Sequence, residues 1–117
     1  MTNDAILCGA LAPLSLPVAE LVYHGDAEDY ITYTLIAERP AAQADDEETE
    51  TVAEYYVTLH LRQPPGPLKR RAKRLLKAAG IGVDSVTQVS FEDGARERFT
   101  LNFDCFILND ETEDGET

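Results

Sequence analysis

The sequence predicts an α+β fold, a two-layer sandwich in which two helices cover one face of a mainly antiparallel β-sheet. Stretches rich in β-branched and aromatic residues alternate with polar residues at a period of two, which is typical of half-buried strands. One strongly amphipathic helix, at 68–79, interrupts them. No apolar stretch approaches the roughly 20 residues that a membrane-spanning helix needs. The length of 117 residues fits a single domain, for which we expect the bounds 1–108.

The N-terminal segment predicts a short helix followed by a strand. Residues 5–11 are apolar, and one of the polar residues 2–4 can cap them as a helix. Two prolines then end this helix. Residues 18–23 are expected to form the first strand, and Gly25 is free to take a positive φ in the turn that follows.

Two further strands are predicted at 30–37 and 52–62, joined by an acidic loop at about 41–51. The loop is polar and has no periodicity, so we expect it to be mobile. The second of these strands alternates apolar with polar residues, and its apolar side chains are Tyr55, Val57, Leu59 and Leu61. The two strands are therefore expected to pair as one long antiparallel hairpin.

The helix at 68–79 carries one apolar stripe that can cover the sheet. Pro67 suits its first turn, and Gly80 lies where a left-handed C-cap belongs. The stripe consists of Leu68, Ala72, Leu75, Leu76 and Ala79.

A second hairpin is predicted from strands 83–91 and 97–108, which flank the turn at Asp93-Gly94. Residues 109–117 form an acidic tail that we expect to be disordered. The predicted order of elements is therefore α-β-β-β-α-β-β. The face of the last strand that must be buried consists of Phe99, Leu101, Phe103, Cys105 and Ile107.

The net charge of −12 argues against binding to a nucleic-acid backbone, which requires a basic surface. Ten of the 22 acidic residues lie in two runs, so the remainder holds 22 − 10 = 12 acidic against 10 basic residues, a net charge of −2. The runs consist of Asp45, Asp46, Glu47, Glu48 and Glu50, and of Asp110, Glu111, Glu113, Asp114 and Glu116.

Six of the ten basic residues lie on the predicted helix at 68–79. One interpretation is a solvated helix face, on which the long side chains merely reach into water. The other is a docking face for an acidic surface, such as the acidic loop of a neighbouring copy. The six residues are Lys69, Arg70, Arg71, Lys73, Arg74 and Lys77.

The sequence predicts no catalytic, cofactor-binding or metal site. Only two histidines occur, His24 and His60, and a metal site would need both to converge with carboxylates. Cys8 and Cys105 form no CxxC pair and have no histidine nearby in the sequence, so we expect both to be small buried residues. The glycines at 80–82 follow a helix, whereas a phosphate-binding loop precedes one.

Between about residues 18 and 106, a series of short motifs follows one another along the chain. They are Tyr23-His24-Gly25, Tyr30-Ile31-Thr32-Tyr33, Pro40 with Asp45-Asp46, Tyr55-Tyr56-Val57, Ala79-Gly80-Ile81, Phe91-Glu92-Asp93, and the final strand through Phe99 and Phe103. In this order the motifs resemble those of the small tail-completion or tail-terminator proteins of long-tailed phages and prophages.

The resemblance implies a structural virion protein and not an enzyme. Such a protein caps the finished tail tube and joins it to the head connector as a ring, commonly of six subunits. The expected partners are other copies of the chain, the tail-tube protein and the head–tail connector protein, with DNA only passing through the channel and no membrane involved. The expected location is the virion neck or tail, and the host cytoplasm during assembly.

The residues expected at partner interfaces are Asp45, Asp46, Glu47, Glu48, Lys69, Arg70, Lys73, Arg74 and Lys77. An alternative from another class is a monomeric acidic binding module or inhibitor, whose acidic runs mimic nucleic acid and block a basic partner. A third alternative is a hydrolase with an unrecognised site.

Overall fold

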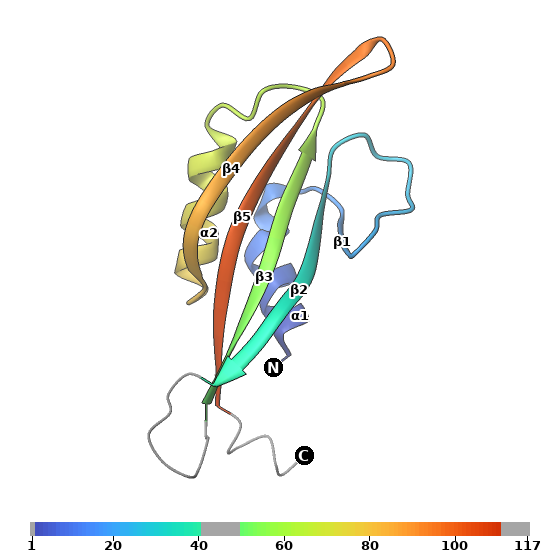
Figure 1. The fold of residues 1–117 in the computed structure, drawn as a ribbon. Helices are drawn as coiled ribbons and strands as arrows, with labels where there is room; N and C mark the ends of the chain where they lie inside the picture. Colours follow the sequence, from blue (N-terminus) through green and yellow to red (C-terminus); the bar gives the residue numbers. More distant parts are fainter. Residues whose placement is uncertain (1, 41–49, 111–117) are drawn as a thin grey trace.

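The computed structural model describes residues 2–40 and 50–110, and the predicted order of elements is confirmed (Figure 1). The 3₁₀-helix η1 follows α1 directly. The elements are α1 (Asn3–Leu11), η1 (Ala12–Leu14), β1 (Val18–Glu20), β2 (Tyr30–Pro40), β3 (Glu50–Leu61), α2 (Leu68–Ala78), β4 (Gly82–Asp93) and β5 (Arg96–Asp110).

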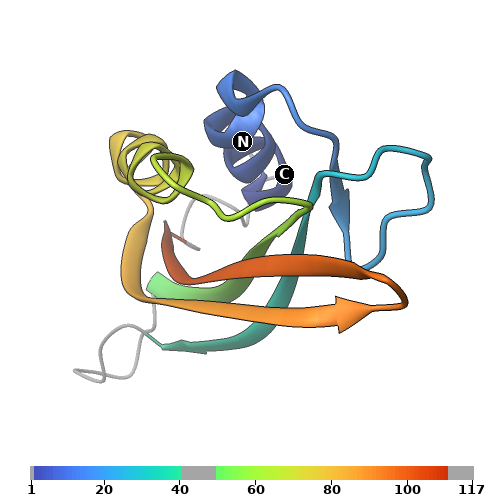
Figure 2. The same ribbon diagram turned by 90° about the horizontal axis from the view of Figure 1, so that it is seen from above.

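The five strands form one mixed sheet in the order β1-β2-β3-β5-β4. β1 runs parallel to β2, and every other neighbouring pair is antiparallel. Both helices lie on the same face of this sheet, which Figure 2 shows from above. The predicted α+β class, a mainly antiparallel sheet covered by two helices, is confirmed.

The core lies between the helices and this one face of the sheet. α1 contributes Leu7 and Leu11, and α2 contributes Ala72 and Leu76, all four fully buried. Because side chains alternate across a strand, the opposite face of the sheet turns to solvent. The buried residues on the three central strands are Ile31, Tyr33, Ala53, Tyr55, Val57, Leu59, Leu61, Leu101, Phe103, Cys105 and Ile107.

The first strand is shorter than expected. It ends at Glu20 and not at residue 23, because Leu21 adopts a left-handed conformation with φ of 65°. Gly25 does not use the positive φ that is open to glycine. Its role is close approach, because an added Cβ would collide with the Tyr23 phenol.

The ends of the helices follow the predicted capping chemistry. Thr2 caps α1 by accepting a hydrogen bond from the Ala5 amide at 3.1 Å. Beyond α2, Gly80 has φ of 86°, and its amide donates to Lys77 O while the next amide, of Ile81, donates to Leu76 O, both at 3.0 Å. These two bonds form a Schellman cap.

The apolar stripe on α2 is narrower than predicted. Ala72 and Leu76 are fully buried, and Leu75 is only half-buried. Ala79 is exposed, contrary to the prediction, because it lies beyond the last helical residue.

β3 and β5 are longer than predicted, because they pair continuously from Glu50–Asp110 to Leu61–Phe99. The expected loop therefore loses residues 50 and 51, and the expected tail loses 109 and 110. Asn3 and Asn109 exchange two amide hydrogen bonds, at 3.0 and 2.9 Å, which tie α1 to the end of β5. The predicted interface residues Asp45, Asp46, Glu47 and Glu48 lie outside the described residues.

Candidate functional site

The solvent-exposed side of α2 forms a basic face. We define it by the predicted residues Lys69, Arg70, Lys73, Arg74 and Lys77, all of which are exposed. Within residues 2–40 and 50–110, none of these five side chains forms an ion pair. The sixth base, Arg71, has a structural contact instead: its Nη2 donates to the carbonyl of Pro13 at 2.9 Å.

Two open hollows lie at the start of the basic face, with volumes of about 380 and 510 Å³. Pro67 and Arg70 line both of them. Pro67 restricts the backbone that forms part of the wall of both hollows. The Arg70 guanidinium can bind a carboxylate through two parallel hydrogen bonds. This geometry suits acidic side chains of a protein partner.

An aromatic stack lies on the open face of the sheet. The rings of Tyr23 and Tyr30 are 4.6 Å apart, and those of Tyr30 and His60 are 4.4 Å apart. The His60 Nε2 lies 3.0 Å from the Thr32 hydroxyl oxygen. Burial, and then the charge of Arg98, lower the pKa of His60. His60 is therefore a neutral, hydrogen-bonded part of the sheet surface at neutral pH.

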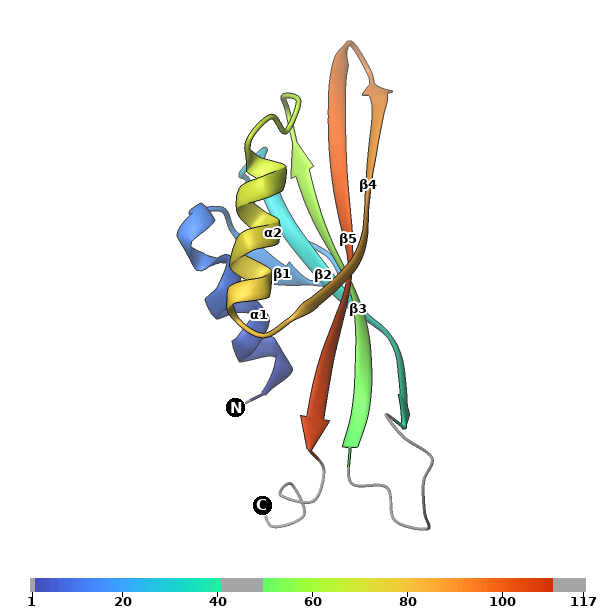
Figure 3. The same ribbon diagram turned by 90° about the vertical axis from the view of Figure 1, so that its left-hand side faces the viewer.

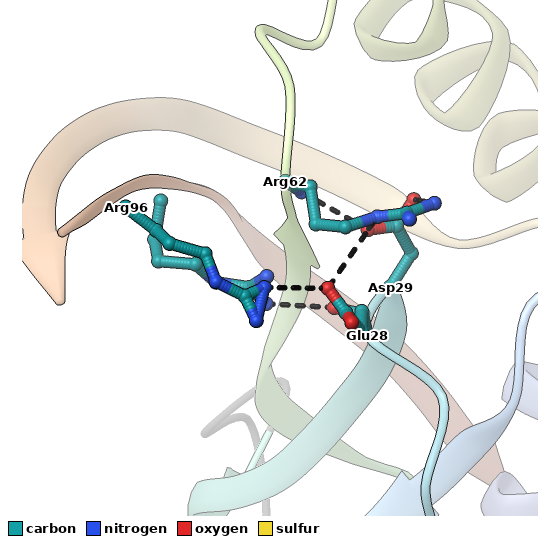
Figure 4. A network of polar contacts seen from close by, with 5 residues as sticks. Glu28, Asp29, Arg62 and Arg96 are labelled. Carbon is teal, nitrogen blue, oxygen red and sulfur yellow. Dashed lines mark hydrogen bonds and ion pairs between the residues drawn. The ribbon is translucent and has the colours of Figure 1, made fainter. Parts of the chain in front are cut away.

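A network of ion pairs ties the 21–29 connection to two distant parts of the sheet (Figure 4). Asp29 Oδ1 accepts from both the backbone amide and Nε of Arg62, at 3.0 and 3.1 Å. Glu28 Oε1 accepts from Arg96 Nη1 at 2.8 Å, and the Glu28 carbonyl accepts from Arg98 at 2.7 Å. The sequence analysis missed this network, because its members come from separate elements and share no local pattern.

Glu54 and Asp104 form a pair of carboxyl groups on the open face of the sheet. Burial raises the pKa of Asp104, and the hydrogen bond and negative charge of Glu54 raise it further. Arg39 acts in the opposite direction and lies 3.7 Å from the Glu54 carboxylate. Asp104 Oδ1 is buried and has no hydrogen-bond partner among the described residues.

The residues considered for chemistry occupy separate environments. Cys105 is buried, and desolvation, followed by the charge of Asp104, raises its pKa to about 12, so it remains a thiol at neutral pH. Cys8 is only half-buried, contrary to expectation. His24 is exposed in the 21–29 connection. No group of three or more histidine, cysteine or acidic side chains in the described ranges could hold a metal ion.

Neither helix described by the structure is long and apolar enough to cross a membrane.

No protein-family model matches the sequence, and no curated protein matches it. Among solved structures, the chain is similar to a chain from the virion of a native gene transfer agent (GTA) particle. The TM-score is 0.45 at 16% sequence identity, and the overlap covers 92% of this chain and 87% of that chain.

Proposed function

We propose that the chain is a structural virion subunit that completes a phage tail tube and joins it to the head connector as a ring of identical copies. The sequence motifs suggest this family. The observation that carries the proposal is the exposed basic face of α2, on a chain whose net charge is −12.

Electrostatic complementarity explains why these two features belong together. Five exposed cations without an ion pair in the described residues leave a strongly positive surface on an otherwise acidic chain. Opposite charges on two surfaces steer association, whereas like charges suppress wrong pairings. An acidic surface on another copy, the tube or the connector can therefore dock on the basic face.

The experiment neutralises the centre of this face. Arg70→Gln with Arg74→Gln should weaken assembly at least about tenfold, which corresponds to about 1.4 kcal/mol. The domain should still fold, because both side chains are exposed. Light scattering after size-exclusion chromatography, with and without tail tubes built from the tube protein of the same phage or prophage, measures assembly.

The matched control is Gln63→Glu with Ala95→Glu, which changes the net charge by the same −2 at exposed positions away from α2. It should assemble like the wild type. If the neutralised helix assembles equally well at ordinary salt, the basic face is only solvated. A wild-type chain that stays monomeric and never joins tubes contradicts the proposed function itself.

A further inference from the structure

The sheet has two open edges on opposite sides. β4 is the terminal strand, and the described chain pairs with it on one side only, through β5. At the other side, β1 covers β2 only from Ile31 to Tyr33, so the stretch 34–40 has no neighbour among the described residues on that side. Open strand edges present unpaired backbone groups to which another strand can add.

The β4 edge lacks the features that usually protect such an edge. Residues 85–91 contain no charged residue, no proline and no glycine. Natural proteins commonly block long exposed edges with lysine, proline or a bulge, because such an edge is otherwise a template for pairing. The one bulge in β4 lies earlier, between Val83 and Ser85. Residues 85–91 of β4 can therefore pair with another strand.

The hairpin register indicates which backbone groups are free. A two-residue turn joins β4 to β5 and closes at the pair Asp93–Arg96. Such a closing pair is hydrogen-bonded, and bonded and open pairs alternate along an antiparallel ladder. Every second residue therefore turns its N–H and C=O away from β5, and these residues include Val86, Gln88 and Ser90.

Exposed apolar side chains concentrate at the same two edges. Leu35 and Ile36 lie on the open stretch of β2, and Val89 and Phe91 lie on β4. Leu21 and Val22 extend the first group, because the Leu21 amide donates to the Tyr33 carbonyl beside that edge. Together they are six of the eight large hydrophobic residues exposed in the described chain. The other two, on the central strands, are Tyr56 and Leu108.

We propose that β4 of one copy pairs antiparallel with the 34–40 edge of β2 in the next copy, so that the sheet continues from subunit to subunit. This inference rests on the proposed function, and it names the contact that joins the copies. The two stretches are similar in length, since each spans seven residues, one of which in 34–40 is the extra residue of the bulge between Leu35 and Ala37. Within one copy β2 and β4 already run in opposite directions, so a rotation about an axis inclined to the strands, as in a barrel, keeps the pairing antiparallel.

A head-to-tail contact fits the edges better than a symmetric one. Pairing β4 with β4 of a second copy would end at a dimer and leave Leu35 and Ile36 exposed. Pairing β4 with β2 uses both edges in every copy and can close into a ring. The strand register of one copy places Ser85 and Thr34 at the same height along the strands. Pairing 85–91 with 34–40 therefore shifts each copy along the strand direction relative to the copy before it. A sheet that closes on itself requires such a stagger.

The test removes one outward amide. Gln88→Pro deletes an N–H that points away from β5, and proline is tolerated on edge strands. Its matched control, Gln88→Ala, keeps the amide. Sedimentation velocity on the full chain, with and without tail tubes, should show assembly at least about tenfold weaker for Gln88→Pro and unchanged for Gln88→Ala. Normal assembly of a folded Gln88→Pro variant overturns the inference and leaves the proposed function standing.

A second variant keeps the test decisive if Gln88→Pro fails to fold. Ile36→Lys places a charge on the opposite edge at a side chain that is already 40% exposed, and it should abolish assembly. Leu108→Lys, on central strand β5 at 59% exposure, should assemble normally. Equal assembly by both lysine variants overturns the inference.

Hydrogen exchange identifies the pairing directly. Assembly should slow exchange at residues 86, 88 and 90 and in 34–40. Slower exchange in β4 alone indicates symmetric pairing and overturns the inference. A wild-type chain that remains monomeric under all conditions overturns both this contact and the proposed function.

Discussion

Asp104 shows how a single carboxyl group can oppose the stability of the sheet. It lies diagonally across from Glu54 on the open face, since Glu54 pairs with Phe106 and Asp104 pairs with Tyr56. Side chains at such diagonal positions interact, and like charges destabilise the pairing. Burial, and then the hydrogen bond and negative charge of Glu54, raise the pKa of Asp104, so the folded state prefers its protonated form.

We therefore expect Asp104→Asn to raise the free energy of unfolding at pH 7 by roughly 0.5 kcal/mol, the size of one unfavourable cross-strand pair. The folded pKa lies above the unfolded one, so the contribution of Asp104 is favourable below the unfolded pKa and is lost as pH rises through the folded pKa. Urea unfolding between pH 3.5 and 7 measures the free energy of unfolding. Its decline with rising pH should be weaker for Asp104→Asn than for the wild type. Asp84→Asn, which removes a charge from exposed β4, should leave the decline unchanged.

At the scale of elements, α2 has two different sides. One side carries the basic face, and the other packs Ala72 and Leu76 against the core, where both are fully buried. The helix therefore presents charge on one side and packs apolar side chains on the other. Its C-terminal Schellman cap directs the chain at once into β4, which places the open edge beside the helix.

We expect Leu76→Ala to destabilise the domain by about 3 kcal/mol, because it leaves a cavity under a fully buried side chain. Leu75→Ala removes the same atoms from a half-buried side chain and should cost about 1 kcal/mol. Thermal and urea unfolding of the two variants measures the difference. Equal losses would contradict the packing of α2. Leu75→Asp should unfold the domain, since a charge would lie against the core.

The 21–29 connection is held by charge more than by packing. Its residues are mostly exposed, and only Tyr23 and Asp29 among 21–29 are partly buried. Asp29 and Glu28 instead anchor it to the end of β3 and to the β4–β5 hairpin.

We expect Asp29→Ala to accelerate hydrogen exchange in residues 21–29 while lowering the global free energy of unfolding by less than about 1 kcal/mol, as is usual for exposed ion pairs. Adding salt to the wild type should produce part of the same effect. Arg39→Ala, which removes a different exposed ion pair, should leave exchange in this connection unchanged. If Asp29→Ala does not accelerate exchange in residues 21–29 more than Arg39→Ala does, the network of Figure 4 does not hold the connection.

For the whole molecule, a two-layer sandwich leaves three surfaces available for contacts. These are the basic face of α2, the open face of the sheet and its two edges. Figure 3 shows that the β4–β5 hairpin extends beyond the start of α2, so one end of the β4 edge lies clear of the helical layer. The proposed ring uses the basic face and the edges, which lie on different sides of the subunit.

Local sequence patterns were enough to predict the fold class, the order of elements and most of the core. Alternation at 52–62 and at 97–108 predicted the buried faces of β3 and β5, except that Phe99 is only partly buried, because period-two patterning is a local consequence of strand geometry. The Gly80 cap was equally predictable, since a left-handed residue at a helix end favours glycine. The basic face followed from helical spacing alone.

The strand order, the parallel placement of β1 and the positions of the open edges follow from tertiary contacts and not from local patterns. Strand order depends on long-range contacts between residues that share no local pattern. The Glu28–Arg96 ion pair and the Glu54–Asp104 carboxyl pair join residues 68 and 50 positions apart, so no periodicity could indicate them. Gly25 is a further example. The sequence suggested a turn conformation there, whereas in the folded chain the Tyr23 ring occupies the space that a Cβ at this position would need.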